Sequence, residues 1–156
     1  MRIRLVAVGP PAAGPLAEAQ DLYLSRLPRA WRVALEAVPA ARPSGRDRGR
    51  RLADEAARLE TVLGTDVTVV VLERTGKAID SEALASRIDR WLSAGRDLAF
   101  VIGGADGLDP ALTGRAEFIW SLSPLTFPHQ LARLVVLEQI YRASTILSGH
   151  PYHSGH

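Results

Sequence analysis

The sequence predicts an α/β fold: a three-layer sandwich with a mostly parallel sheet of five or six strands. Short apolar runs alternate along the chain with segments whose apolar residues recur at helical spacing. Strands separated by helices are typical of a parallel sheet with helices on both faces. With 156 residues, 47% of them hydrophobic, the chain is long enough for one domain with a substantial core. We therefore expect a single domain over residues 1–156.

Five apolar runs predict the strands. Residues 98–102 carry no charge and contain only apolar side chains, as in a strand whose two faces are both covered. Residues 31–38 alternate instead between apolar and polar side chains, which is typical of a half-buried strand. The other strands are predicted at residues 3–8, 67–72 and 118–122.

Capping residues and prolines mark the predicted helices. Asp80 or Ser81 begins one helix and the pair Asp109-Pro110 begins another, since Asp caps free N–H groups and Pro suits a first helical turn. Gly64 and Gly95 are typical stop signals. The helices are predicted at residues 15–27, 49–63, 81–94, 110–115 and 129–147, the last apolar on more than one face and hence well buried.

Three loops follow the strands at 67–72, 98–102 and 118–122, and they span residues 73–77, 103–107 and 123–128. The carboxyl ends of parallel strands share one edge of the sheet, where ligands bind in open α/β folds. Gly103 and Gly104 allow a close approach of the backbone to a ligand. The alternative is a simple tight turn, because Gly-Gly-x-x-Gly alone is a weak motif.

Several function classes are excluded by what the sequence lacks. Without cysteine the chain has no disulfide, thiolate nucleophile or cysteine-bound metal. Walker A, His-Glu-x-x-His and Gly-x-Ser-x-Gly motifs are absent. No apolar run approaches 18 residues, and the apolar start breaks at Gly-Pro-Pro, residues 9–11. We expect a cytoplasmic protein that does not enter a membrane.

Basic residues are concentrated in residues 42–51, predicted as a loop. Net charge is only +2, yet the isoelectric point is about 9.5 and every basic residue except Lys77 is arginine. Five arginines stand against one Asp in this loop. Clustered arginines either bind nucleic acid phosphates or form a solvated loop. On the first interpretation Arg46, Arg48, Arg50 and Arg51 contact RNA.

The end of the chain is rich in histidine, with His150, His153 and His156 spaced three apart. Imidazole is a common metal ligand, but no cysteine or carboxylate stands nearby, and we expect no metal. A mobile tail is the usual state of a terminus. Alternatively Tyr152 stacks on a base while His153 takes up a proton.

Four segments closely resemble the RlmH (YbeA) family of SPOUT-class methyltransferases. They read Phe-Val-Ile-Gly-Gly-Ala-Asp-Gly-Leu (100–108), Trp-Ser-Leu-Ser-Pro-Leu-Thr-Phe-Pro-His-Gln (120–130), Leu-Glu-Gln-Ile-Tyr-Arg-Ala (137–143) and His-Pro-Tyr-His (150–153). The resemblance covers the full length, although residues 1–65 match only in outline. It implies methylation of N3 of a pseudouridine in 23S rRNA of the large ribosomal subunit. It also implies a homodimer and a C-terminal trefoil knot, which the pattern of residues does not predict.

The resemblance places an S-adenosylmethionine pocket on the three loops proposed above. It maps the pocket onto Leu72, Gly103 and the segment from Leu122 to Phe127. With the glycine loop included, the predicted cofactor residues are Leu72, Gly103, Gly104, Leu122, Ser123, Pro124, Leu125, Thr126 and Phe127.

Four residues are candidates for the reaction itself: His129, Arg142, Tyr152 and His153. Either histidine is suited to accept the N3 proton, and the sequence does not choose between them. Arg142 binds a substrate phosphate or pairs with Glu138, four residues earlier on a helix. A non-catalytic RNA-binding module on the ribosome is the rival function, which explains the basic residues but not three converging loops.

Overall fold

A computed structural model describes residues 2–42 and 47–154. Its sheet has five strands in the order β2-β1-β4-β3-β5, and all neighbours are parallel. The strands are β1 (Ile3–Val8), β2 (Ala34–Val38), β3 (Val67–Ala78), β4 (Asp97–Ile102) and β5 (Phe118–Ser121). The predicted parallel sheet is confirmed, with five strands rather than six in the described part of the chain.

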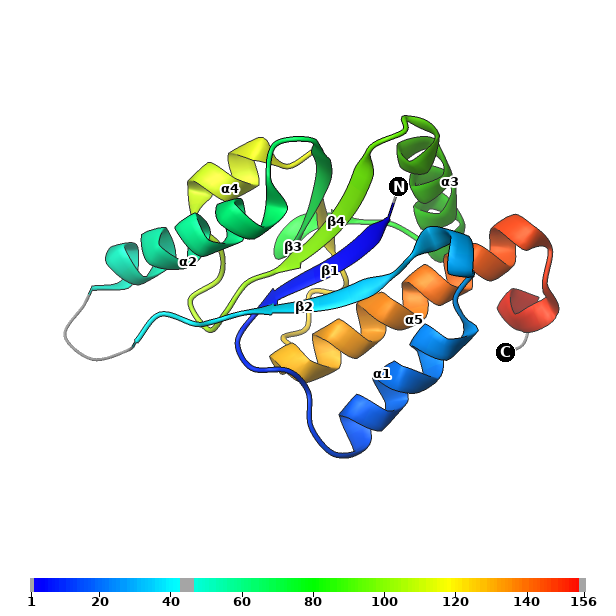
Figure 1. The fold of residues 1–156 in the computed structure, drawn as a ribbon, viewed down its shortest axis with the longest axis horizontal. Helices are drawn as coiled ribbons and strands as arrows, with labels where there is room; N and C mark the ends of the chain where they lie inside the picture. The colour runs from blue at the N-terminus through cyan, green and yellow to red at the C-terminus, as the bar shows by residue number, and fades with distance from the viewer. Residues whose placement is uncertain (1, 43–46, 155–156) are drawn as a thin grey trace.

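Helices cover both faces of the sheet, which gives the three predicted layers (Figure 1). One face carries α1 (Pro15–Arg26), α3 (Ser81–Ser93) and α5 (His129–Ser148), with α5 packed against both others. The other face carries α2 (Arg48–Leu63) and α4 (Pro110–Arg115). Two short 3-10 helices are η1 (Arg29–Trp31) and η2 (Pro151–Ser154).

The core lies in two clusters, because alternate residues of each central strand face opposite layers. Phe100 is fully buried in the cluster beneath α1, α3 and α5, whereas its neighbours Ala99 and Val101 belong to the cluster beneath α2 and α4. This burial on both faces explains the uninterrupted apolar run of β4. In α5, Leu137 and Ile140 are fully buried, which confirms a helix deep in the fold.

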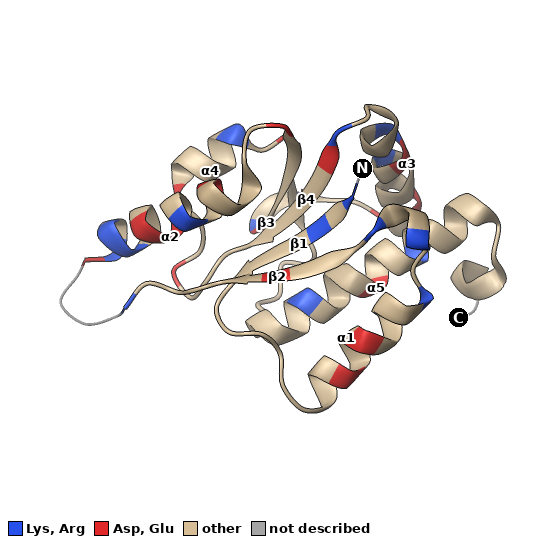
Figure 2. Cartoon of the chain, viewed as in Figure 1, with Lys and Arg blue, Asp and Glu red and all other residues tan. Residues whose placement is uncertain are grey.

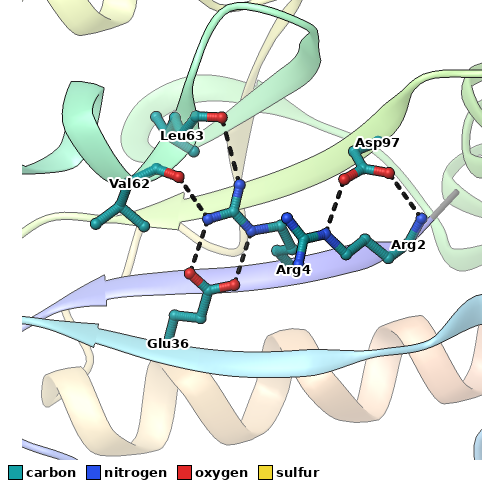
Figure 3. Close-up of polar contacts among 6 residues, drawn as sticks. All are labelled: Arg2, Arg4, Glu36, Val62, Leu63 and Asp97. Atoms are coloured by element: carbon teal, nitrogen blue, oxygen red, sulfur yellow. Dashed lines mark hydrogen bonds and ion pairs between the residues drawn. The ribbon is translucent and has the colours of Figure 1, made fainter.

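A buried arginine joins the sheet to the end of α2 (Figure 3). Arg4 on β1 is 4% exposed and donates two hydrogen bonds of 2.7 Å to the Glu36 carboxylate of β2. It also donates to the carbonyl oxygens of Val62 and Leu63, at 2.6 and 3.4 Å. These carbonyls end α2 and carry its negative dipole, so a cation suits the position. Nearby, Arg2 pairs with Asp97 at 2.8 Å.

The predicted helix starts are confirmed by their caps. The Asp80 carboxylate accepts a hydrogen bond of 2.7 Å from the Ala83 N–H, and Asp109 accepts one of 2.8 Å from the Ala111 N–H. Asp47 caps α2 in the same way through Arg50, at 2.8 Å. In the described ranges no helix is long and apolar enough to cross a membrane.

Three predicted boundaries are wrong. The strand predicted at residues 31–38 begins only at Ala34, because Trp31 ends η1 and Arg32 has a left-handed backbone with φ of 47°. The loop predicted at residues 73–77 lies within β3, which bulges after Leu72 and then pairs with β5 again from Lys77. The arginine-rich loop is shorter than predicted, because α2 begins at Arg48; residues 43–46, including Arg46, lie outside the described ranges.

Candidate active site

A cavity of about 310 Å³ lies beyond the ends of β4 and β5 and beside the bulge that follows Leu72 in β3. Its volume is at the lower end of the usual range for small-molecule sites. Every predicted cofactor residue except Pro124 lines it: Leu72, Gly103, Gly104, Leu122, Ser123, Leu125, Thr126 and Phe127. The structure therefore brings the segments after β4 and β5 together with the bulge of β3 at one edge of the parallel sheet.

The loop from Gly103 to Leu108, here called the glycine loop, forms one wall of this cavity. A Cβ on Gly103 would lie 2.5 Å from the Gly107 carbonyl oxygen, so no side chain fits there. The Gly107 N–H donates a hydrogen bond of 3.1 Å to the Gly104 oxygen, and Gly107 has a φ of 84° that favours glycine. The loop is thus folded tightly on itself.

The packing around Gly104 gives a second reason for glycine at this position, besides the predicted close approach of a ligand. A Cβ on Gly104 would point toward Val8 and Glu55, at 3.1 and 3.3 Å, and so toward α2 behind the loop. Glycine at this position therefore also lets the loop pack against the protein. The backbone of Gly104 still lines the cavity.

Ser121 connects the two segments that form the opposite wall of the cavity. Its hydroxyl is shared between the carbonyl oxygens of Arg74 and Ser123, at 2.9 and 3.2 Å, and its side chain is buried. The Ser123 hydroxyl in turn accepts a hydrogen bond of 3.0 Å from the Leu125 N–H. Glu73 and Arg74 line the cavity, as expected for the segment 73–77, although neither was predicted as a cofactor residue; Ser121 was not predicted at all. A serine at the end of a strand beside a predicted loop was the one available signal.

The four residues predicted for the reaction fall into two groups in this chain. His129, the first residue of α5, lines the cavity. Arg142 lies thirteen positions further along the same helix, about 20 Å away at 1.5 Å per residue. Tyr152 and His153 follow in η2, beyond the far end of α5 (Figure 1). Only His129 therefore stands beside the cavity of its own chain.

Glu138 organises the second group. Its Oε1 accepts hydrogen bonds from Arg142 Nε and Nη2, at 3.0 and 2.8 Å, and from the Tyr152 hydroxyl at 3.1 Å. The Arg142 guanidinium also lies 4.9 Å from the centre of the Tyr152 ring, which packs 4.7 Å from the Tyr141 ring. The ion pair considered as the alternative for Arg142 is thus present, and it holds the guanidinium beside Tyr152.

This packing makes η2 an ordered segment rather than the frayed terminus considered above. The pKa of the Tyr152 hydroxyl is raised above its usual value, mainly by burial and then by hydrogen bonding with Tyr23 and Glu138. Tyr152 is therefore protonated at neutral pH. His153 Nδ1 is buried and has no hydrogen-bond partner within the described ranges. In the same ranges no group of three His, Asp or Glu side chains is arranged to hold a metal ion.

The lining of the cavity combines apolar side chains with backbone polar groups. Apolar side chains such as Leu72, Leu122 and Trp120 stand beside backbone groups of the tightly folded glycine loop. Apolar walls with a few polar groups are typical of cofactor sites. The arrangement can enclose the flat apolar part of a small molecule while backbone groups hydrogen-bond its polar edge.

The fold and this cavity are those of a SPOUT-class methyltransferase. A family model described as "Predicted SPOUT methyltransferase" matches residues 1–153. Two solved structures share the fold. A probable methylase family protein from Haemophilus influenzae Rd KW20 has a TM-score of 0.58 and 12% identity, and the match covers 96% of this chain and 69% of that one. A probable methyltransferase from Bordetella pertussis Tohama I has a TM-score of 0.56 and 18% identity, and the match covers 91% of this chain and 95% of that one.

Curated relatives indicate which SPOUT methyltransferases this chain is similar to in sequence. "Ribosomal RNA large subunit methyltransferase H" of Alkalilimnicola ehrlichii is 49% identical over 154 residues, or 98% of this chain and 99% of the relative. The protein of the same name from Anaeromyxobacter dehalogenans (strain 2CP-C) is 46% identical over 153 residues, with the same coverage. The chain therefore belongs to the SPOUT methyltransferase family, and its resemblance to the RlmH family is confirmed.

Proposed function

We propose that this chain transfers a methyl group from S-adenosylmethionine to N3 of a pseudouridine in 23S rRNA of the large ribosomal subunit. One observation carries the proposal: the cavity gathers nearly all the residues that the RlmH resemblance assigns to the cofactor. The names of its relatives support large-subunit ribosomal RNA as the substrate. Such a substrate places the enzyme in the cytoplasm.

In this mechanism the chain mainly binds the cofactor and the RNA and positions their reacting atoms. Leu72, Leu122 and Leu125 enclose the adenine, and backbone groups of the glycine loop bind its edge. When bound, S-adenosylmethionine supplies an electrophilic methyl group on its sulfonium. His129 or His153 would take the proton from N3 as the N–CH₃ bond forms, the S–CH₃ bond breaks and the uncharged thioether S-adenosylhomocysteine leaves. Holding the reacting atoms in line contributes most of the rate.

We propose a homodimer because the second group of predicted residues lies far from its own cavity. The distance along α5 from His129 to Arg142 alone is about 20 Å. In a dimer that pairs the ends of α5, Tyr152 of the partner subunit reaches this cavity. The interface needs exposed apolar residues, which α1 and α5 carry at Leu22 and Leu131, 47% and 36% exposed. Leu137 and Ile140 are buried within the chain and contribute nothing to such an interface.

The RNA-binding surface includes the start of α2. Figure 2 shows basic residues there, and Arg42 and Arg50 are exposed on either side of the residues left undescribed. Exposed arginines bind phosphates without reading the base sequence. Arg48 and Arg51 contact the glycine loop instead, as described below.

A direct test uses purified protein, labelled S-adenosylmethionine and ribosomal subunits from a strain that lacks the endogenous enzyme. We expect label in 23S rRNA at one pseudouridine, identified by mass spectrometry of nuclease fragments. Calorimetry with S-adenosylmethionine separates the proposal from the rival RNA-binding module: the module binds RNA but no cofactor. Cofactor binding without any rRNA methylation would leave the family in place and refute the substrate.

A further inference from the structure

We propose that Arg51 on α2 and Asp106 in the glycine loop hold that loop in the conformation that binds the cofactor. Arg51 is then a positioning residue for cofactor binding, although it does not line the cavity. This inference rests on the proposed function, because it assigns the cavity to S-adenosylmethionine.

The contact is bidentate. Arg51 Nε donates to Asp106 Oδ2 at 2.9 Å, and Arg51 Nη2 donates to Asp106 Oδ1 at 3.3 Å. The two side chains are only 22% and 26% exposed. Arg48 adds a third bond, because its Nη2 donates to the backbone carbonyl oxygen of Asp106 at 2.9 Å. Both the side chain and the backbone of Asp106 are thus held from one helix.

A second contact supports the same loop one helical turn along α2. Glu55 is 6% exposed, and its carboxylate lies 3.3 Å from the place where a Cβ of Gly104 would stand. Its Oε1 accepts a hydrogen bond of 3.0 Å from the Ala41 N–H. Residues four apart share one face of a helix, so Arg51 and Glu55 present a single face of α2 to the back of the glycine loop.

The glycine loop needs such support because its own sequence does not rigidify it. Gly103, Gly104 and Gly107 give the unbound backbone wide conformational freedom. Gly104 and Gly107 pair with each other across the loop, where the Gly107 N–H donates to the Gly104 oxygen. Ordering a flexible loop at the moment of binding lowers affinity, whereas a loop already held in place does not incur that cost.

The charges of the pair agree with this role. The Arg51 guanidinium lowers the pKa of the Asp106 carboxyl below its usual value, and Asp106 raises the pKa of Arg51. Both groups are therefore charged throughout the physiological range, and the support does not depend on pH near neutrality.

The experiment compares four variants with the wild-type protein: Arg51→Gln, Asp106→Asn, the exchanged pair Arg51→Asp with Asp106→Arg, and Glu60→Gln. The last is the matched control, because Glu60 lies on α2 like Arg51 but pairs with Arg115 of α4 rather than with the glycine loop. Calorimetry gives the dissociation constant of S-adenosylmethionine, and amide hydrogen exchange gives the protection of residues 103–108. Urea unfolding and circular dichroism confirm that each variant is folded.

We expect Arg51→Gln and Asp106→Asn to weaken cofactor binding by about fivefold or more, within the usual range for coupling between two sites. The KM for the cofactor should rise while kcat at saturating cofactor stays within about twofold, because binding can restore the loop. Protection of residues 103–108 should fall in both single variants, the exchanged pair should recover part of the affinity, and Glu60→Gln should behave as wild type.

Two results would overturn the inference. One is wild-type affinity and loop protection in folded Arg51→Gln and Asp106→Asn. The other is an equal loss in Glu60→Gln, which would indicate a general effect of α2 on stability. Failure of the wild-type protein to bind S-adenosylmethionine would instead refute the proposed function, so the two failures are distinguishable.

Discussion

Replacing Tyr152 tests whether the packed tail serves both stability and catalysis. Tyr152→Phe removes one hydrogen bond of 3.1 Å to the Glu138 carboxylate and keeps the ring. At this partly buried site we expect a loss of about 1 kcal/mol of unfolding free energy, the typical net contribution of one hydrogen bond. Tyr152→Ala also removes the ring contacts with Tyr141 and Arg142. Those contacts add about 1 to 2 kcal/mol together.

Urea unfolding at one fixed protein concentration measures these differences, because dimerisation makes stability depend on concentration. With a slope of about 2 kcal/mol/M, a loss of 1 kcal/mol lowers the urea midpoint by roughly 0.5 M. Tyr152→Ala should lower it by about 1 M or more by the same arithmetic. Val62→Ala, at an exposed site on α2 on the other face of the sheet, is the control and should stay within about 0.5 kcal/mol of wild type.

Methyl transfer provides the second readout. If Tyr152 stacks on a base of the RNA, Tyr152→Phe keeps most of the activity and Tyr152→Ala loses orders of magnitude, while cofactor affinity changes little in both. A wild-type urea midpoint for Tyr152→Ala would refute the packing argument. Loss of activity in Tyr152→Phe equal to that in Tyr152→Ala would refute stacking and assign the role to the hydroxyl.

Three further predictions concern other parts of the molecule. Glu36→Gln should destabilise the fold at pH 7 by about 2 kcal/mol, since it leaves buried Arg4 without its anion. Arg4 lowers the pKa of Glu36, so the pair stabilises the fold fully above the ordinary carboxyl pKa of 4.5 and loses this effect as the pH falls further. In acid unfolding curves the difference in unfolding free energy between variant and wild type should therefore shrink toward pH 3. Gly103→Ala should weaken cofactor binding in calorimetry and lower the urea midpoint, because its Cβ meets the Gly107 oxygen at 2.5 Å; wild-type values for both would show that the loop adjusts freely. Replacing Arg42 and Arg50 together by Gln should flatten the salt dependence of RNA binding by about 0.7 to 0.9 log units per lost phosphate contact, with cofactor affinity unchanged; an unaltered slope would identify both as solvated side chains.

Local patterns were sufficient for the elements of the fold and for the segments around the cavity. The apolar run of β4 indicates burial on both faces, and Asp80 and Asp109 mark helix starts, because each signal acts within a few residues. Once the strands are recognised as parallel, their carboxyl ends must meet, so the grouping of Gly103 and Leu122 around one cavity follows from topology, and Leu72 joins them at the bulge of β3.

Only the tertiary structure decided how the charged and polar residues are used. Arg51 and Asp106 are 55 positions apart, and nothing local distinguishes this arginine from one that binds RNA. The second pairing of β3 depends on the adjacent strand β5 and overrides a polar, glycine-containing segment that locally favours a loop. The length of α5 separates His129 from Arg142, Tyr152 and His153. A helix rises about 1.5 Å per residue, so residues that are close in the sequence lie far apart when a long helix connects them.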